Sequence, residues 1–430
     1  MRKKKYVFVV GLDDFNLEKL NHLPESEECE FLPAVKLSEM RDVEEFSIPG
    51  LLETADKRIK EAARIDSVVT WFDFPGSVLV PIIAEKYNVP GPSLKSVMKC
   101  EHKYWSRLEQ KKAIPENIPK FKAFDIYDDN AYDDIGFKPP FWIKPIKSYG
   151  SYLAYRIENK EQFNKCIEEA REHIDLMVEP FTYIFDKYKV SPEISKMKEK
   201  MFAETVIAGH QCTAEGYSVN NKIEVYGIID SILEGDTSSF ARYEYPSSLN
   251  QEAQDRIAEV SKKVIRQIGL KTSAFNIEYF YNEKTGEINL LEINPRMSQS
   301  HGDMFEKVHG LSHHEIMLNI ALGRKPVKLD KKGDFKVASH FMLRSFKPGI
   351  VTSVPTEEKI NELKKKYPDF DIMLNVKEGM DLDDMAEHHI DSYSYVMANI
   401  FLGAQSRKEL LEKYNNVVEE LAIKTDPKEE

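Results

Sequence analysis

The chain has 430 residues, 42% of them hydrophobic, which is enough for two to four domains with ordinary buried cores. Its 60 basic and 72 acidic residues give a net charge of -12, which argues against a nucleic-acid surface as the main partner. No apolar run approaches transmembrane length, the N-terminus is a poor secretory signal, and the four scattered cysteines fit no disulfide or metal spacing. We therefore expect a globular cytoplasmic protein without a membrane partner.

The first hundred residues alternate short apolar runs with amphipathic segments. Tyr6 to Val10 and Ser67 to Trp71 are typical of buried strands, and residues 51–63 and 78–87 are typical of helices. This βαβα order predicts an open parallel sheet with helices on its faces. The chain has neither a GxGxxG fingerprint nor a P-loop.

Two lysines stand out in the next part of the chain. Residues 93–112 form a strongly helical run with Lys103 in its middle, where an exposed helix lysine is the alternative to an anion-binding one. Lys144 interrupts the buried-strand pattern of residues 141–145. Because an unpaired ammonium is costly inside a sheet, this position favours a lysine that projects into a site and meets an anion.

The middle of the chain predicts a mixture of helices and antiparallel strands. Residues 161–173 and 251–268 read as helices, the second of which ends at Gly269, and residues 201–207, 212–217 and 222–230 read as strands. Residues 232–248 contain the run Ser238 to Tyr243, which is either a substrate-contacting loop or a packed crossover.

Residues 275–281 and 288–293 predict a hairpin, because a Lys-Thr-Gly turn signal separates two runs rich in β-branched and aromatic residues. A loop of residues 283–287 places Glu278 opposite Glu292, and Asn276 opposite Asn294. The apolar face then consists of Ile277, Tyr279, Leu291 and Ile293.

Facing carboxylates repel each other, so the open end of this hairpin calls for a cation. Asn294 adds an amide oxygen and Arg296 adds a guanidinium suited to phosphate or carboxylate, a combination that fits Mg²⁺ held jointly by protein and phosphates. A solvated hairpin face is the alternative for the two glutamates.

Several histidines follow the hairpin. His301 is either a donor to an anionic intermediate or a hydrogen-bonded loop residue. His313 and His314 fall in the first turn of a helix that begins with a capping box of Ser312 and Glu315, which disfavours a dedicated metal site. Beyond them we expect a strand at 338–343 and helices at 356–367 and 408–421, and Arg344 is a candidate substrate contact.

The acidic residue followed by Glu292-x-Asn294-x-Arg296 resembles the metal-binding hairpin of the ATP-grasp ligases, and looser agreement extends over about residues 1–420. The resemblance implies an ATP-grasp fold of mixed α/β and α+β class with an N-terminal Rossmann-like pre-ATP-grasp domain. It implies four parts: residues 1–95, the pre-ATP-grasp domain; 96–205, a linker helix and small subdomain; 206–328, the large subdomain with the metal site; and 329–430, a C-terminal α+β part similar to that of biotin carboxylases.

The same resemblance implies the site residues. Glu278, Glu292 and Asn294 would bind Mg²⁺, with Mn²⁺ as the alternative, and Arg296, Lys144 and His301 would be catalytic. The residues implied to bind ATP are Lys103, Lys144, Ser148, Gly150, Ser151, Glu204, Thr205, Val206, Ile207 and Gln211. Two departures leave nucleotide preference open: the phosphate loop at 147–152 has only one glycine, and Gln211 stands where the family often has a ribose-binding glutamate.

The resemblance implies a ligase that activates a carboxylate as an acyl phosphate and joins it to an amine, releasing ADP and phosphate. Its partners would be small-molecule substrates, with a homodimer as one possible assembly. Two alternatives stay open: a biotin-carboxylase-like enzyme that activates bicarbonate, and a nucleotide-binding regulatory protein with degraded catalysis.

Overall fold

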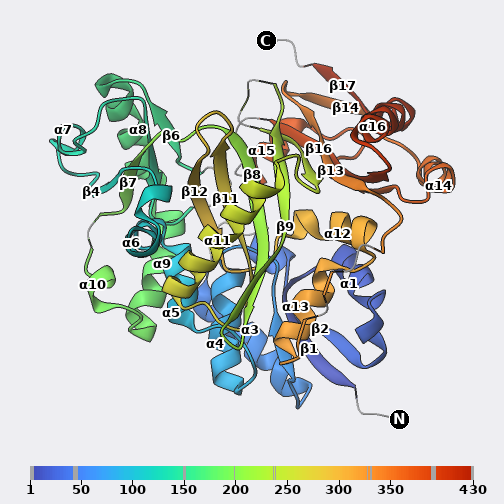
Figure 1. The fold of residues 1–430 in the computed structure, drawn as a ribbon, viewed down its shortest axis with the longest axis horizontal. Helices are drawn as coiled ribbons and strands as arrows, with labels where there is room; N and C mark the ends of the chain where they lie inside the picture. Colours follow the sequence, from blue (N-terminus) through green and yellow to red (C-terminus); the bar gives the residue numbers. More distant parts are fainter. Residues whose placement is uncertain are drawn as a thin grey trace.

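The computed structural model describes residues 4–41, 47–148, 152–197, 199–235, 237, 239–326, 328–329, 332–388 and 394–427. Figure 1 shows an N-terminal unit at the bottom, a small sheet on the left, a large sheet in the centre and the C-terminal part at the upper right. Among the described residues, no helix is long and apolar enough to cross a membrane.

The N-terminal unit contains a parallel sheet of order β2-β1-β3. Its strands are β1 (Lys5–Leu12), β2 (Cys29–Lys36) and β3 (Ser67–Val69), and its helices include α1 (Asp14–Asn21), α3 (Ile48–Glu61) and α4 (Gly76–Tyr87). The predicted βαβα unit is confirmed. Sequence reasoning missed β2, where Glu30 and Pro33 interrupt the apolar pattern. An edge strand tolerates Pro33 because one side of its ladder is unpaired, and Glu30 is exposed to solvent.

The single helix predicted for residues 93–112 is wrong. The chain forms two helices there, α5 (Leu94–Glu101) and α6 (Lys103–Ala113). His102 separates them, because its side chain accepts a hydrogen bond from the backbone N–H of Trp105 and caps the second helix. Lys103 therefore lies at the start of a helix, where its backbone N–H donates to the carbonyl of Ile146 at 2.8 Å.

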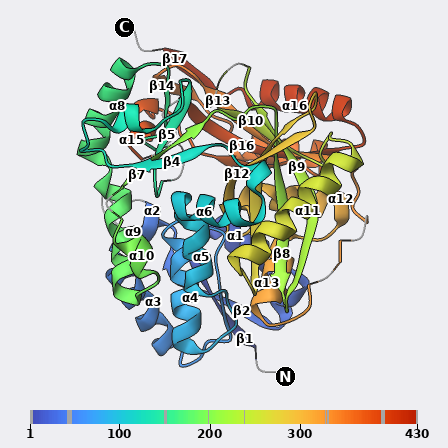
Figure 2. The same cartoon turned by 60° about the vertical axis from the view of Figure 1, so that its left-hand side comes forward.

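The small sheet has the order β4-β7-β5-β6 and packs against a helix of its own. Its elements are β4 (Phe121–Phe124), β5 (Phe141–Pro145), β6 (Tyr155–Ile157), α8 (Lys160–His173) and β7 (Met201–Thr205). In Figure 2, α9 (Asp175–Tyr188) leaves this sheet and runs beside α4 and α5. The rings of Phe181 and Phe185 on α9 contact the ring of His102, which ties the small sheet to the N-terminal helices.

The large sheet has eight strands in the order β12-β11-β8-β9-β10-β13-β16-β15. Its strands are β8 (His210–Val219), β9 (Lys222–Leu233), β10 (Phe240–Tyr245), β11 (Ser273–Asn282), β12 (Glu287–Asn294), β13 (Val337–Ser345), β15 (Asp371–Leu374) and β16 (Tyr395–Ala404). The helices after β10 are α11 (Gln251–Ile268), α12 (Gly302–His309), α13 (His313–Ala321), α14 (Glu357–Lys366), α15 (Leu382–His388) and α16 (Arg407–Leu421). The C-terminal strands thus extend the sheet that contains the hairpin, and the predicted four-part division stays a prediction.

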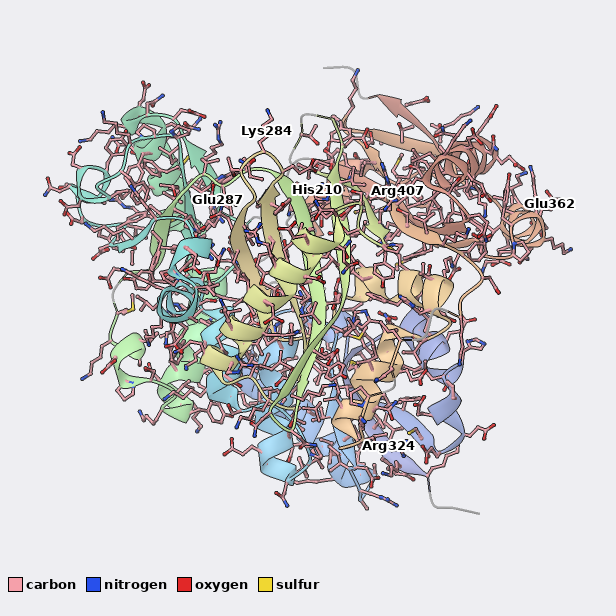
Figure 3. All side chains as sticks on the ribbon, in the orientation of Figure 1. His210, Lys284, Glu287, Arg324, Glu362 and Arg407 are labelled. Atoms are coloured by element: carbon pink, nitrogen blue, oxygen red, sulfur yellow. The ribbon has the colours of Figure 1, made fainter. Side chains whose placement is uncertain are left out.

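The hairpin register is confirmed where it matters most for the site. Glu278 pairs with Glu292, and Asn276 pairs with Asn294. A bulge follows, so that Tyr279 pairs with Leu290. Leu290 is fully buried and Leu291 lines a cavity, so the predicted place of Leu291 on the apolar face is wrong. Figure 3 places Lys284 and Glu287 at the turn end of the hairpin.

Candidate active site

Two cavities meet at the open end of the β11–β12 hairpin. The first, of about 450 Å³, lies between the small and the large sheet, and the second, of about 330 Å³, lies between the large sheet and the segment after β3. Glu278 and Phe240 line both cavities. A molecule in one cavity would therefore meet a molecule in the other beside Glu278.

The first cavity gathers most of the predicted nucleotide residues. Those that line it are Lys103, Lys144, Ser148, Glu204, Thr205, Val206, Ile207 and Gln211. Gly150 and Ser151 lie outside the described residues. Lys147, expected in the phosphate loop, is only 2% exposed and pairs with Glu101, so it is a buried structural cation.

Glu204 holds two cations at the wall of the first cavity. One carboxylate oxygen lies 2.5 Å from Nε of Arg107, and the other lies 3.1 Å from Nζ of Lys144. Burial raises the pKa of Glu204, but the charges of Arg107 and Lys144 outweigh burial and lower it to about 2. Lys144, which interrupts the buried pattern of β5, does meet an anion, and in this structure that anion is the Glu204 carboxylate.

The predicted metal ligands face one another across the hairpin. Asn294 Nδ2 donates to Glu278 at 3.4 Å, and Glu292 pairs with the ammonium of Lys103. Burial and the facing charge of Glu292 raise the pKa of Glu278 to about 7. Two opposed carboxylates whose negative charge is only partly compensated are a fitting set of hard oxygen ligands for a divalent cation.

Arg296 projects from the end of the hairpin toward the N-terminal unit. Its Nη2 lies 2.6 Å from Asp73, whose other oxygen lies 3.3 Å from Nζ of Lys147. The Nε of Arg296 is buried, and the described residues offer it no hydrogen-bond acceptor. A guanidinium with an unsatisfied buried N–H is suited to an incoming anion. Sequence reasoning missed Asp73, although an acid just beyond a parallel strand is a recognisable signal.

His301 lines the second cavity and is 3% exposed. Its Nδ1 lies 2.7 Å from Glu215, a carboxylate with no exposed surface on β8. Sequence reasoning missed Glu215, because β8 mixes polar and apolar residues and only the folded structure shows that its middle is buried. His313 lies 3.2 Å from the other oxygen of Glu215 and contacts the hydroxyl of Tyr226 at 2.6 Å.

The run Ser238 to Tyr243 is predicted to be either a substrate-contacting loop or a packed crossover, and the structure matches neither alternative fully. From Phe240 onward it is strand β10, and Phe240 and Tyr243 line the second cavity. Ser238 lies outside the described residues. Arg344 donates to the carbonyl of Phe240 at 2.7 Å, so it supports this wall.

Comparison with known proteins identifies the domain around the first cavity. Residues 137–302 match the family described as "ATP-grasp domain". The carbamoyl phosphate synthase large chain of Myxococcus xanthus is 25% identical over 306 residues, which are 68% of this chain and 26% of that protein. A D-alanine--D-alanine ligase of Treponema denticola is 24% identical over 302 residues, 67% of this chain and 69% of the ligase. This chain thus spans about a quarter of the length of the carbamoyl phosphate synthase chain.

Solved structures show the same fold over the whole length. The L-amino acid ligase from Bacillus licheniformis has a TM-score of 0.72 at 14% identity, with 100% of both chains covered. A biotin carboxylase from Campylobacter jejuni has a TM-score of 0.69 at 14% identity, covering 98% of this chain and 92% of the carboxylase. Residues 137–302 thus match the ATP-grasp domain, the chain shares the fold of these ligase and carboxylase structures, and the predicted fold class is confirmed.

Proposed function

We propose that this protein is an ATP-dependent carboxylate–amine ligase that forms an acyl phosphate and releases ADP and phosphate. The proposal rests on one observation: two cavities meet at Glu278. Residues predicted to bind ATP line the first cavity, and Arg296 and His301 line the second. A carboxylate in the second cavity would face the γ-phosphate of ATP in the first. A cavity of about 330 Å³ suits small-molecule substrates.

In the first cavity, backbone groups of residues 205–207 would read the adenine, and Gln211 would bind the ribose, since an amide both accepts and donates hydrogen bonds. Lys103, Lys144 and Ser148 would bind the phosphates. The two lysines pair with Glu292 and Glu204 in this structure, and ATP would replace those carboxylates as the anion that each ammonium meets.

Glu278, Glu292 and Asn294 would hold Mg²⁺, or Mn²⁺ with the same oxygen ligands. The ion, when bound, neutralises charge that develops on the transferring phosphoryl group. Arg296 would bind the carboxylate that is activated, since its unsatisfied Nε–H can donate a hydrogen bond to an anion. Asp73 would keep this guanidinium oriented.

The proposal is tested with ATP, Mg²⁺ and a screen of small acids, amino-acid pairs and bicarbonate. The correct acid should release ADP and, with hydroxylamine present, give a hydroxamate, and adding the correct amine should give an amide. AMP and pyrophosphate as stoichiometric products would overturn the proposal. Turnover that requires bicarbonate and biotin would favour the carboxylase alternative, and ATP binding without ADP release would favour the regulatory one.

A further inference from the structure

We infer that His301, oriented by Glu215, is the base that removes a proton from the acceptor amine before the amine attacks the acyl phosphate. This inference rests on the proposed ligase function. It assigns a catalytic role to His301 in the second half of the reaction and a positioning role to Glu215.

The geometry of the pair decides which ring nitrogen carries the lone pair. Nδ1 of His301 lies 2.7 Å from a carboxylate oxygen of Glu215. A carboxylate accepts hydrogen bonds, so Nδ1 carries the proton and Nε2 carries the lone pair. The ring of Tyr243 meets the imidazole edge to face at a centroid distance of 4.8 Å, which restricts rotation of the ring.

The surroundings keep the imidazole uncharged at neutral pH. The titratable or charged groups that face it from the neighbouring elements are Glu215, Tyr243, Arg296, His313 and His340. Burial lowers the pKa of His301; the hydrogen bond and charge of Glu215 oppose this effect, and the positive charge of Arg296 reinforces it. A neutral imidazole in a substrate cavity is able to take up a proton.

The acceptor needs such a base, because an amino group at neutral pH is largely an ammonium without a lone pair. Nε2 of His301 takes one proton from the ammonium. The freed lone pair forms the C–N bond at the carbonyl carbon of the acyl phosphate, and the C–O bond to the phosphoryl group breaks. The second proton of the amine leaves with the phosphate as hydrogen phosphate, and the imidazolium returns its proton to water.

Hydroxylamine separates this role from a structural one, because it is uncharged at neutral pH and needs no base. His301→Gln should leave ADP release and hydroxamate formation near the wild-type rate at pH 7, while amide formation falls about 100-fold. Raising the pH to about 9 should restore most of the amide formation, since the amine then loses its proton to solvent. Glu215→Gln should lower the ratio of amide formation to hydroxamate formation by about 10-fold, as expected for a positioning residue.

His309→Gln is the matched control, because this buried histidine contacts the hydroxyl of Tyr245 and does not line the second cavity. Both rates should stay near wild type in this variant. Equal loss of hydroxamate and amide in His301→Gln would overturn the inference, and so would no loss of either. If the wild-type protein gives neither ADP nor hydroxamate with any acid, the ligase function itself fails, and the inference fails with it.

Discussion

At the residue scale, the ion pairs of Glu204 at the wall of the first cavity should stabilise the folded protein. They hold the pKa of Glu204 at about 2, below the usual 4.5. A carboxyl group with a lowered pKa contributes stability that is present above pH 4.5 and is lost as the pH falls toward 2. This contribution should be about 3 kcal/mol. Urea unfolding across this pH range should show this loss of unfolding free energy in the wild type and in the control variant Glu252→Gln, which changes an exposed glutamate. Glu204→Gln should lack it, and an unchanged pH profile would contradict the ion-pair assignment.

Lys144 should matter more for nucleotide binding than for folding. Glu204 keeps Arg107 when Lys144 is removed, so Lys144→Ala should change the free energy of unfolding by no more than about 1 kcal/mol. The Kd for ATP should rise about 10- to 100-fold, as measured by calorimetry. Lys284→Ala, at the distant turn of the hairpin (Figure 3), should leave the Kd unchanged. A large loss of stability with normal ATP affinity would instead make Lys144 a structural lysine.

Glu292 tests the metal assignment. Glu292→Gln removes one carboxylate from the proposed ligand set, so Mg²⁺-dependent ADP release should fall by about 100-fold or more. The fold should persist, because the side chain is 35% exposed. Glu287→Gln changes the same residue type at the other end of the same strand and should keep full activity (Figure 3). Normal turnover of Glu292→Gln at saturating Mg²⁺ would rule out the assignment.

At the element scale, the bulge in the hairpin places two neighbouring leucines, Leu290 and Leu291, in different environments. Arg107 donates to the carbonyl oxygens of both Leu290 and Leu291, at 3.0 and 2.9 Å, and so supports the irregular backbone. Leu290 is turned into the core, whereas Leu291 lines the first cavity. The bulge thus brings an apolar side chain to the proposed nucleotide site, directly beside Glu292, a proposed metal ligand.

The two leucines form a matched pair of variants. Leu290→Ala should lower the free energy of unfolding by about 2–5 kcal/mol, because it opens a cavity in the core. Leu291→Ala should cost much less stability and should weaken ATP binding, since it removes an apolar wall of the first cavity. Denaturant unfolding and ATP titration of both proteins check this. The reverse pattern would show that the regular register of the sequence prediction is right.

At the scale of the whole molecule, Asp73 joins three parts of the chain. It follows β3 in the N-terminal unit, Lys147 lies beyond β5 of the small sheet, and Arg296 ends the hairpin of the large sheet. The charges of Lys147 and Arg296 outweigh burial and hold the pKa of Asp73 well below its usual range. Asp73 and Arg296 therefore line the second cavity as a pair, and Lys147 from the third part supports Asp73 without lining that cavity.

Asp73→Asn should lower kcat/KM for the acid about 10- to 100-fold, because Arg296 loses its orienting partner, while the KM for ATP stays near wild type. Steady-state kinetics with each substrate varied in turn measure this split. Asp56→Asn is the control, since Asp56 pairs with Lys60 and Lys86 in the same unit and lines neither of the two cavities. An equal rise in the KM for ATP would place Asp73 in the nucleotide site instead.

Features that depend on neighbours in the chain could be predicted from the amino-acid sequence. The strand-turn-strand pattern predicts the hairpin, the alternation of side chains along it brings Glu278 opposite Glu292, and Asn294 and Arg296 follow within a few residues. Helix α11 ends at Gly269 as predicted, because glycine takes the left-handed conformation at its end.

The partners of these residues could not be predicted from the sequence, because they come from distant parts of the chain. Arg296 and Asp73 are 223 positions apart in the chain, and His301 and Glu215 are 86 apart. The bulge at Leu291 likewise depends on Arg107, which reaches it from another element. The periodicity of a sequence indicates which face of a helix or strand a side chain occupies. The pairing of buried charges depends instead on how separate elements pack, because a buried charge is stable only beside a partner.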